Sequence, residues 1–159
     1  MSPELCIRQI EYGSAEWEAE VQLRLTVLRQ PLGLTFPLEE LALETDTLHI
    51  GAFAADTLIG CLLLTPQTQT ICKMRQVAVA AKYRGRGIGR ALVQHAEVAA
   101  KQNGYTEIVL HARETAVAFY LALKYLPEGE PFTEVTLPHL AMRRKLSQKA
   151  DILGSPNQF

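Results

Sequence analysis

The sequence has 159 residues, of which 48% are hydrophobic and 21% charged, and its net charge is −1. This is the composition of one ordinary globular domain with a sufficient core of its own. A net charge near zero supplies no overall field for nucleic acid or an anionic membrane, so neither partner is expected. The three cysteines form no CxxC pair, and the N-terminus lacks a charged-then-apolar signal pattern. We therefore expect buried, reduced thiols and a cytoplasmic protein.

The first third of the chain predicts a strand, a long helix and a short helix. Leu5–Ile10 is the strand, and Ser14 is a suitable N-cap for a helix that runs to about Gln30 with apolar residues at helical spacing. Proline and glycine residues then break the chain before a short helix at Leu38–Glu44.

The middle of the chain predicts a hairpin, a third strand and a helix. The apolar runs Leu48–Ala54 and Leu58–Leu64 form the hairpin, and Ile71–Ala80 is the next strand. The helix begins at Ile88 and ends at Asn103–Gly104, which is a strong stop signal.

The last part of the chain predicts a strand, a helix and two more strands. These are Ile108–His111, about Thr115–Leu123, Phe132–Thr136 and His139–Lys145. This order of elements indicates an α/β (α+β) domain over residues 1–146, with a mixed sheet covered by helices. Residues 147–159 lack periodicity and are expected to fray.

The segment Arg84–Gly89 reads Arg-Gly-Arg-Gly-Ile-Gly and joins a buried strand to a helix. Glycines allow close approach of the backbone to a ligand, and a helix start offers unpaired N–H groups with a positive dipole end. Together these features predict a phosphate-binding loop. A purely structural glycine turn is the alternative, and the flanking arginines disfavour it.

Spacing excludes two common phosphate-binding loops. A P-loop requires Gly-x-x-x-x-Gly-Lys-Ser/Thr, but no Lys-Ser/Thr pair follows Gly85. A dinucleotide fingerprint requires Gly-x-Gly-x-x-Gly, but its third position is Arg90 when counted from Gly85 and Leu92 when counted from Gly87.

The same segment resembles the Arg/Gln-x-x-Gly-x-Gly/Ala pyrophosphate loop of the GNAT superfamily of N-acetyltransferases. Ala116–Tyr125 is similar to the later Ala-x-x-Phe-Tyr segment of that family, and Phe132–Met142 is similar to a stretch of its ElaA-like branch. The resemblance implies the GNAT fold, a mostly antiparallel sheet whose fourth and fifth strands splay apart. Lys124 stands where the family usually has glycine, so the helix before it is expected to end in a different turn.

The resemblance also implies acetyl-CoA as co-substrate and attack by a primary amine on its thioester. The backbone N–H of Val77 would polarise the thioester carbonyl. The residues expected to bind acetyl-CoA lie on the fourth strand and in the loop: Val77, Ala78, Val79, Arg84, Gly85, Arg86, Gly87, Ile88, Gly89 and Arg90. No metal is expected, because the four histidines show no ligand spacing.

Three residues are candidates for proton transfer. Tyr120 resembles the general acid of many family members. We expect it to be rotated off the core face of its helix, which Phe119 and Leu123 would form; a packed tyrosine is the alternative. The ElaA-like stretch suggests Glu134 and His139 as the base, although His139 is equally well explained as a structural histidine.

The acceptor amine cannot be deduced from the sequence. His111 and Arg113 are expected beside the cleft. An acidic cluster either receives a cationic substrate or is solvated surface; it consists of Glu39, Glu40, Glu44 and Asp46. The expected acceptor is an amine on a small molecule or a peptide. Two alternative functions stay open, a protein lysine or N-terminal acetyltransferase and a non-catalytic acyl-CoA-binding module. A homodimer also stays open.

Overall fold

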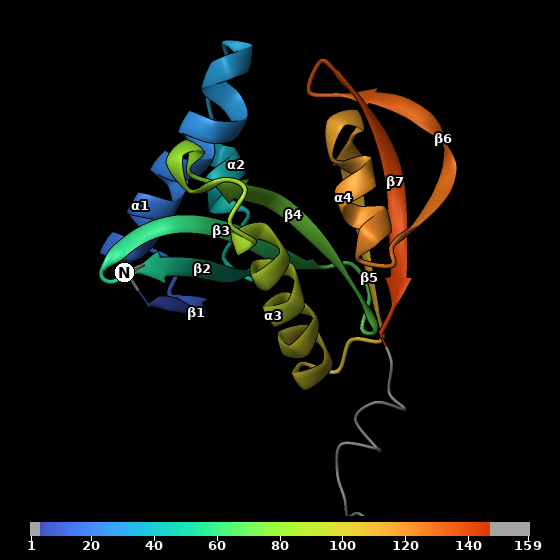
Figure 1. The fold of residues 1–159 in the computed structure, drawn as a ribbon, viewed down its shortest axis with the longest axis horizontal. Coiled ribbons are helices and arrows are strands. Elements are labelled where there is room, and N and C mark those ends of the chain that lie inside the picture. The colour runs from blue at the N-terminus through green and yellow to red at the C-terminus, as the bar shows by residue number, and fades with distance from the viewer. Residues whose placement is uncertain (1–3, 147–159) are drawn as a thin grey trace, which may run out of the picture.

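The protein is described by a computed structural model that places residues 4–146. The tail predicted at 147–159 lies outside the described residues. A seven-stranded sheet in the order β1-β2-β3-β4-β5-β7-β6 forms the centre of the fold (Figure 1). All neighbouring strands are antiparallel except β4 and β5, which are parallel. The predicted mixed sheet is therefore confirmed.

The strands match the predicted runs closely, apart from β6. Their bounds are β1 Leu5–Ile10, β2 Leu48–Ala54, β3 Thr57–Pro66, β4 Ile71–Val79, β5 Glu107–Arg113, β6 Leu126–Glu134 and β7 Leu137–Lys145. The strand predicted at Phe132–Thr136 is wrong at both ends, because Val135 and Thr136 form the turn with φ of 48° and 65°. The start of β6 was not predicted because Pro127 and Pro131 disfavour a strand, but β6 lies at the edge of the sheet, where proline is tolerated.

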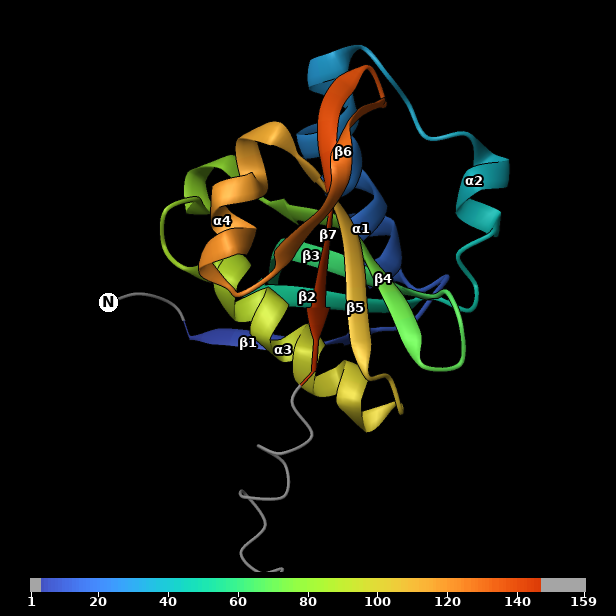
Figure 2. The same cartoon turned by 90° about the vertical axis from the view of Figure 1, so that its right-hand side faces the viewer.

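Helices cover both faces of the sheet (Figure 2). The α-helices are α1 Ala15–Arg24, α2 Leu38–Ala42, α3 Ile88–Gln102 and α4 Val117–Ala122. Ser14 caps α1 as predicted, because its side chain accepts a hydrogen bond from the Trp17 N–H. Helical structure continues after α1 as a π-helical turn, Leu25–Arg29, and a short 3₁₀ turn that ends at Gly33.

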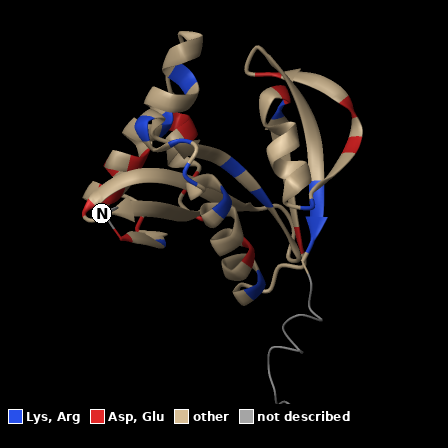
Figure 3. Cartoon of the chain, in the orientation of Figure 1, with Lys and Arg blue, Asp and Glu red and all other residues tan. Residues whose placement is uncertain are grey.

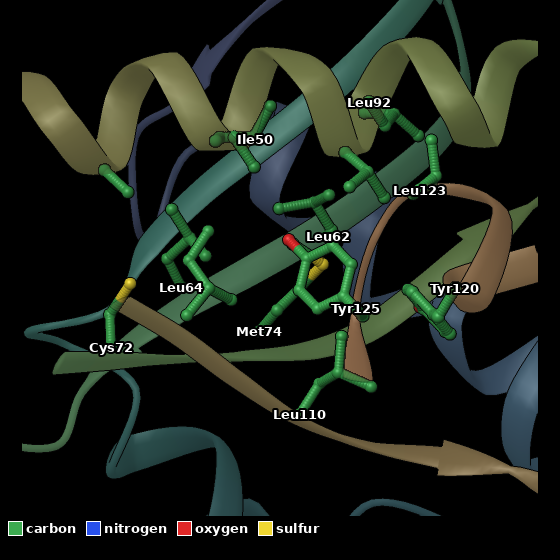
Figure 4. Close-up of a cluster of buried hydrophobic side chains, with 14 of the residues drawn as sticks. Ile50, Leu62, Leu64, Cys72, Met74, Leu92, Leu110, Tyr120, Leu123 and Tyr125 are labelled. Carbon is green, nitrogen blue, oxygen red and sulfur yellow. The ribbon is translucent and has the colours of Figure 1, made fainter. Parts of the chain in front are cut away.

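The main core lies between the sheet and α3 with α4 (Figure 4). Ile50, Leu62, Met74 and Leu110, from four strands, belong to the same buried cluster as Leu92 of α3. Burial of these aliphatic side chains stabilises the fold by about 1.5–3 kcal/mol each. No helix among residues 4–146 combines the length and apolar character needed to span a membrane.

Helix α4 ends in the turn that a glycine would make, which corrects the expectation for Lys124. Lys124 adopts a left-handed conformation with φ of 76°, and the Tyr125 N–H donates to the Tyr120 carbonyl across the turn. This backbone conformation is strained for a residue other than glycine, and the Lys124 side chain is exposed. The helix end therefore follows the family geometry without the family residue.

Candidate active site

The parallel strands β4 and β5 are paired over only four positions, from Ile71 with Glu107 to Met74 with Leu110. Beyond Met74 the two strands diverge, and Figure 1 shows β4 turning away from β5 toward α1. A cavity of about 320 Å³ opens at the divergence, with Val77 and Tyr120 among its lining residues. The predicted splay of the fourth and fifth strands is therefore confirmed.

A bulge in β4 lies at the same point. Cys61 pairs with Ala78 and Leu63 pairs with Arg75, so Leu62 faces two residues, Gln76 and Val77. Gln76 has φ of 57°, a left-handed conformation that costs about 1–3 kcal/mol in a non-glycine residue and is common at functional sites. The sequence gives no sign of the bulge, because neither glycine nor proline marks it.

The glycine loop leaves the start of α3 open to a ligand. Gly87 is the N-cap with φ of 79°, and no side chain caps the helix. The N–H groups of Ile88, Gly89 and Arg90 therefore lack the intrahelical partners that later residues have. A Cβ added at Gly85 or Gly87 would meet no atom within 4 Å, so space is free beside the loop.

A second cavity, of about 500 Å³, adjoins the loop. It is lined by Arg84, Gly85, Gly87, Ile88, Gly89 and Arg90 on one side and by Val79, Phe119 and Ala122 on the other. Arg86 is exposed and stacks its guanidinium 5.2 Å from the Tyr83 ring centroid instead. Residues 77–79 of β4 connect the two cavities, because Val77 lines the first, Val79 lines the second, and Ala78 between them is buried.

These features fit acetyl-CoA on two grounds. The open N–H groups and the arginines suit the pyrophosphate, and the apolar wall of Phe119 and Ala122 suits the pantetheine arm. Gln76 also lines the first cavity, and its Oε1 is buried without a hydrogen-bond partner among residues 4–146.

Tyr120 is more deeply buried than expected. It is 7% exposed and belongs to the core cluster, whereas Phe119 is 37% exposed and faces the loop cavity. The predicted core face of α4 was therefore wrong at these two positions, since the helix is entered through a 3₁₀ turn, Glu114–Ala116, that rotates it. Burial raises the pKa of Tyr120, so its hydroxyl stays protonated.

The structure brings Glu134 and His139 together at the mouth of the first cavity. Oε2 of Glu134 lies 3.9 Å from Nε2 of His139, while Oε1 lies 2.8 Å from Nδ1 of His111. Burial acts to raise the pKa of Glu134, but the His111 hydrogen bond and the nearby charge of Lys73 outweigh it and lower the pKa. Nδ1 of His139 donates to the Leu137 carbonyl, which leaves Nε2 facing Glu134.

The structure divides the predicted acidic cluster, because Glu39 and Asp46 are exposed, Glu40 is partly buried and Glu44 is buried. Glu44 is 2% exposed, and both of its carboxylate oxygens accept hydrogen bonds from Arg24. Glu40 lines the first cavity but is bonded to Arg29 at 3.0 Å. A carboxylate in such a pair is poorly placed to receive a cationic substrate.

Sequence reasoning missed Lys73 and Arg75, which line the first cavity from β4. Their alternation with the buried Cys72 and Met74 could have found them, because it places both on the other sheet face from the core. The residues 4–146 contain no group of three or more His, Cys, Asp or Glu side chains arranged to hold a metal ion.

Comparison with known proteins agrees with this geometry. The model of the acetyltransferase (GNAT) family matches residues 14–125. The chain therefore belongs to the GNAT acetyltransferase family, as the sequence resemblance predicted.

Individual proteins give the same fold. An acyl-CoA N-acyltransferase from Pseudomonas aeruginosa is 25% identical with a TM-score of 0.75, covering 90% of this chain and 99% of that one. Escherichia coli ElaA is 18% identical with a TM-score of 0.76, covering 89% and 100%. YitI, an uncharacterized N-acetyltransferase of Bacillus subtilis (strain 168), is 30% identical over 90 residues, 53% of this chain. The match spans 60% of YitI, less than two thirds of its length.

Proposed function

We propose that this protein transfers the acetyl group of acetyl-CoA to a primary amine, by direct attack of the amine on the thioester. The observation that carries the proposal is the continuity of the two cavities along residues 77–79 of β4. One end has the open helix start for an anion, and the other has the buried tyrosine and the strand divergence. The family and the Pseudomonas aeruginosa acyl-CoA N-acyltransferase support it.

The loop and β4 would bind and orient acetyl-CoA. The N–H groups at the start of α3, with Arg84 and Arg90, hold the pyrophosphate. The free side of β4 pairs with the pantetheine arm as an added strand. This arrangement brings the thioester to the bulge, where the Val77 N–H stabilises the developing oxyanion; one such donor is worth about 3–4 kcal/mol in other acyl-transfer enzymes.

Proton transfer would use the three predicted residues. The attacking amine must lose a proton, which passes to one base, Glu134 or the adjacent His139. The departing thiolate must gain one, which Tyr120 supplies from a hydroxyl that burial keeps protonated. The acceptor is a small molecule or a peptide, entering from the side of Arg29 and Glu134.

The experiment is a binding titration with Gly87→Val and a matched control. Gly87 and Gly104 both have a left-handed backbone and free space at the added Cβ, so valine strains both equally. Only Gly87→Val places a side chain in the loop. We expect calorimetry to show acetyl-CoA binding by wild type and Gly104→Val and at least a tenfold loss in Gly87→Val.

A transfer assay completes the test. Thiol release from acetyl-CoA should depend on an added amine and should disappear with Gly87→Val. Equal acetyl-CoA affinity in the two glycine variants would overturn the loop assignment. Binding without amine-dependent release across a broad amine panel would overturn the catalytic proposal.

A further inference from the structure

The cavity at the strand divergence has an excess of positive charge. Its lining includes four cationic side chains, Arg29, Lys73, Arg75 and Arg113, against two carboxylates, Glu40 and Glu134. Figure 3 shows blue bands on the middle of β4, next to the divergence. Charge of one sign inside a partly enclosed cavity concentrates ligands of the other sign.

Both carboxylates already have partners. Glu40 accepts a hydrogen bond from Arg29 at 3.0 Å, and Glu134 is bonded to His111 at 2.8 Å. Glu134 interacts electrostatically with Lys73, but Arg75 and Arg113 form no ion pair with either carboxylate of the cavity.

Arg75 and Arg113 have free donor groups. Within the described part of the chain, Arg75 makes no hydrogen bond or ion pair, and Arg113 makes one hydrogen bond, from Nη2 to the Leu28 carbonyl at 2.9 Å. A guanidinium carries five N–H donors in a planar fork that matches a carboxylate or a phosphate. Each half-buried guanidinium therefore presents unused donors to the cavity.

Lys73 lies within the electrostatic influence of Glu134 but forms no ion pair among residues 4–146. Its Nζ lies 3.2 Å from Nδ1 of His111, but that same nitrogen faces Glu134. One ring nitrogen cannot donate to the carboxylate and accept from the ammonium at once. Because Nδ1 of His111 donates its hydrogen to Glu134, it cannot accept a hydrogen bond from the Lys73 ammonium.

The positive charges that line the cavity repel one another. Burial, and then the charge of Arg29, lower the pKa of Arg113. Burial lowers the pKa of Lys73 too, with Arg75 adding to the effect and Glu134 opposing it. An anion bound among these groups would relieve the repulsion.

The cations share one sheet face. Lys73 and Arg75 on β4, and Arg113 on β5, alternate with residues that pack on α3. They therefore project away from α3, toward the side where the π-helical segment Leu25–Arg29 follows α1. The open start of α3 and the loop cavity use a separate set of residues.

We propose that the acceptor is a small amine that also carries an anionic group, a carboxylate or a phosphate, held by Arg75 and Arg113. The inference rests on the proposed acetyl transfer and names its substrate class. Lys73 supplies further positive charge. The anionic group then fixes the amine beside Val77.

The test compares matched acceptors and matched variants. The acceptors are the common L-amino acids against their carboxamides, and 2-aminoethyl phosphate against ethanolamine. Arg75→Gln and Arg113→Gln keep a polar side chain and remove the charge. Arg8→Gln is the control, because Arg8 lies on β1 at the edge of the sheet, where it pairs with Glu16 and stacks on the Phe53 ring, and it does not line the cavity. Unfolding midpoints confirm that each variant is folded, and calorimetry measures its acetyl-CoA affinity.

We expect at least one anionic acceptor to exceed its neutral partner in kcat/KM by tenfold or more. The amino acid arm indicates a carboxylate, and the phosphate arm indicates a phosphate. Each arginine variant should raise KM for that acceptor by about 10- to 100-fold, the equivalent of one charge-assisted hydrogen bond, with acetyl-CoA affinity unchanged. Arg8→Gln should behave as wild type.

Three results would overturn the substrate class. The first is a higher kcat/KM for the uncharged acceptors than for the anionic ones. The second is no turnover of any of these acceptors although acetyl-CoA binds normally. The third is loss of acetyl-CoA affinity in the arginine variants, which would assign the cations to the cofactor. Failure of wild-type protein to bind acetyl-CoA would instead overturn the proposed function itself.

Discussion

Tyr120 and Tyr125 are both buried, five residues apart, but their hydroxyl groups differ. The Tyr125 hydroxyl donates to Glu97 at 2.9 Å and lies among the aliphatic core side chains (Figure 4). The Tyr120 hydroxyl has no hydrogen-bond partner among residues 4–146, and the side chain lines the cavity at the strand divergence. The Tyr125 hydroxyl is therefore engaged in a structural hydrogen bond, whereas the Tyr120 hydroxyl is available to a ligand.

Tyr120→Phe should lower kcat by about 10²–10⁴, the usual contribution of a general acid, and should leave acetyl-CoA affinity unchanged. Tyr125→Phe is the matched control. It should reduce the free energy of unfolding by about 1 kcal/mol, because it removes one hydrogen bond, with kcat unchanged. Single-turnover measurement of acetyl transfer checks both. A wild-type transfer rate in Tyr120→Phe would show that Tyr120 is not the acid.

Glu134→Gln should lower kcat/KM at neutral pH, because the carboxylate that takes part in proton acceptance is lost. The deficit should shrink as the pH approaches the pKa of the free amine, near ~10.4 for a lysine-type amine, where the substrate no longer needs a base. The pH profile of kcat/KM checks this. A loss that is constant with pH would indicate a purely structural role for Glu134.

At the scale of elements, a buried ion network joins α1 to β2 and to the turn after α2. Arg24 is fully buried and bonds to Glu44 at 3.0 and 3.1 Å and to Glu20 at 3.3 Å. Glu20 in turn contacts Nδ1 of His49 at 2.9 Å. The network anchors the start of the π-helical segment that carries Arg29 into the cavity.

Arg24→Met should destabilise the protein by about 3–5 kcal/mol, because it leaves two buried carboxylates short of a cation. Arg8→Ala, which breaks the exposed pair with Glu16 and removes the guanidinium stacked on Phe53, should reduce the free energy of unfolding by only about 1 kcal/mol. Urea denaturation measures both variants. A similar small change in both would mean that the buried network contributes no more than a surface pair.

At the scale of the whole molecule, several buried acids hold their protons in the folded state. Burial raises the pKa of Cys72 to about 12 and raises those of Cys61, Tyr120 and Tyr125 as well. The unfolded chain releases these protons at lower pH, near ~8.5 for cysteine and ~10 for tyrosine. Their contribution to stability is therefore complete below about pH 8 and is lost as the pH rises. Lys73, whose pKa is lowered, acts in the opposite direction.

We expect the urea midpoint to fall steadily from about pH 8.5 to pH 11. Tyr125→Phe should reduce the slope above pH 10, because it removes one of the groups that titrate only on unfolding. Urea titrations of both proteins at matched ionic strength measure the slopes. A midpoint that does not change between pH 8 and 11 would contradict the burial of these groups.

Local patterns in the sequence were sufficient for the order of elements, the glycine loop and the family. Continuous apolar runs predict β2 and β3, which are buried along most of their length, and helical apolar spacing predicts α3, which buries one face. The alternating glycines of Arg84–Gly89 mark a loop on their own. Tyr120, Glu134 and His139 follow from motif resemblance, and the structure gathers all three at one cavity.

Only the tertiary structure decided which groups meet across the strand divergence. Arg113 lies far in the sequence from Lys73 and Arg75, and the cavity that the three share depends on the sheet register and on where β4 leaves β5. The same applies to Glu44, which local composition presents as an exposed acid but which the fold pairs with Arg24 in the interior. Secondary structure follows from short-range periodicity, whereas the charge of a cavity depends on long-range pairing that no local pattern records.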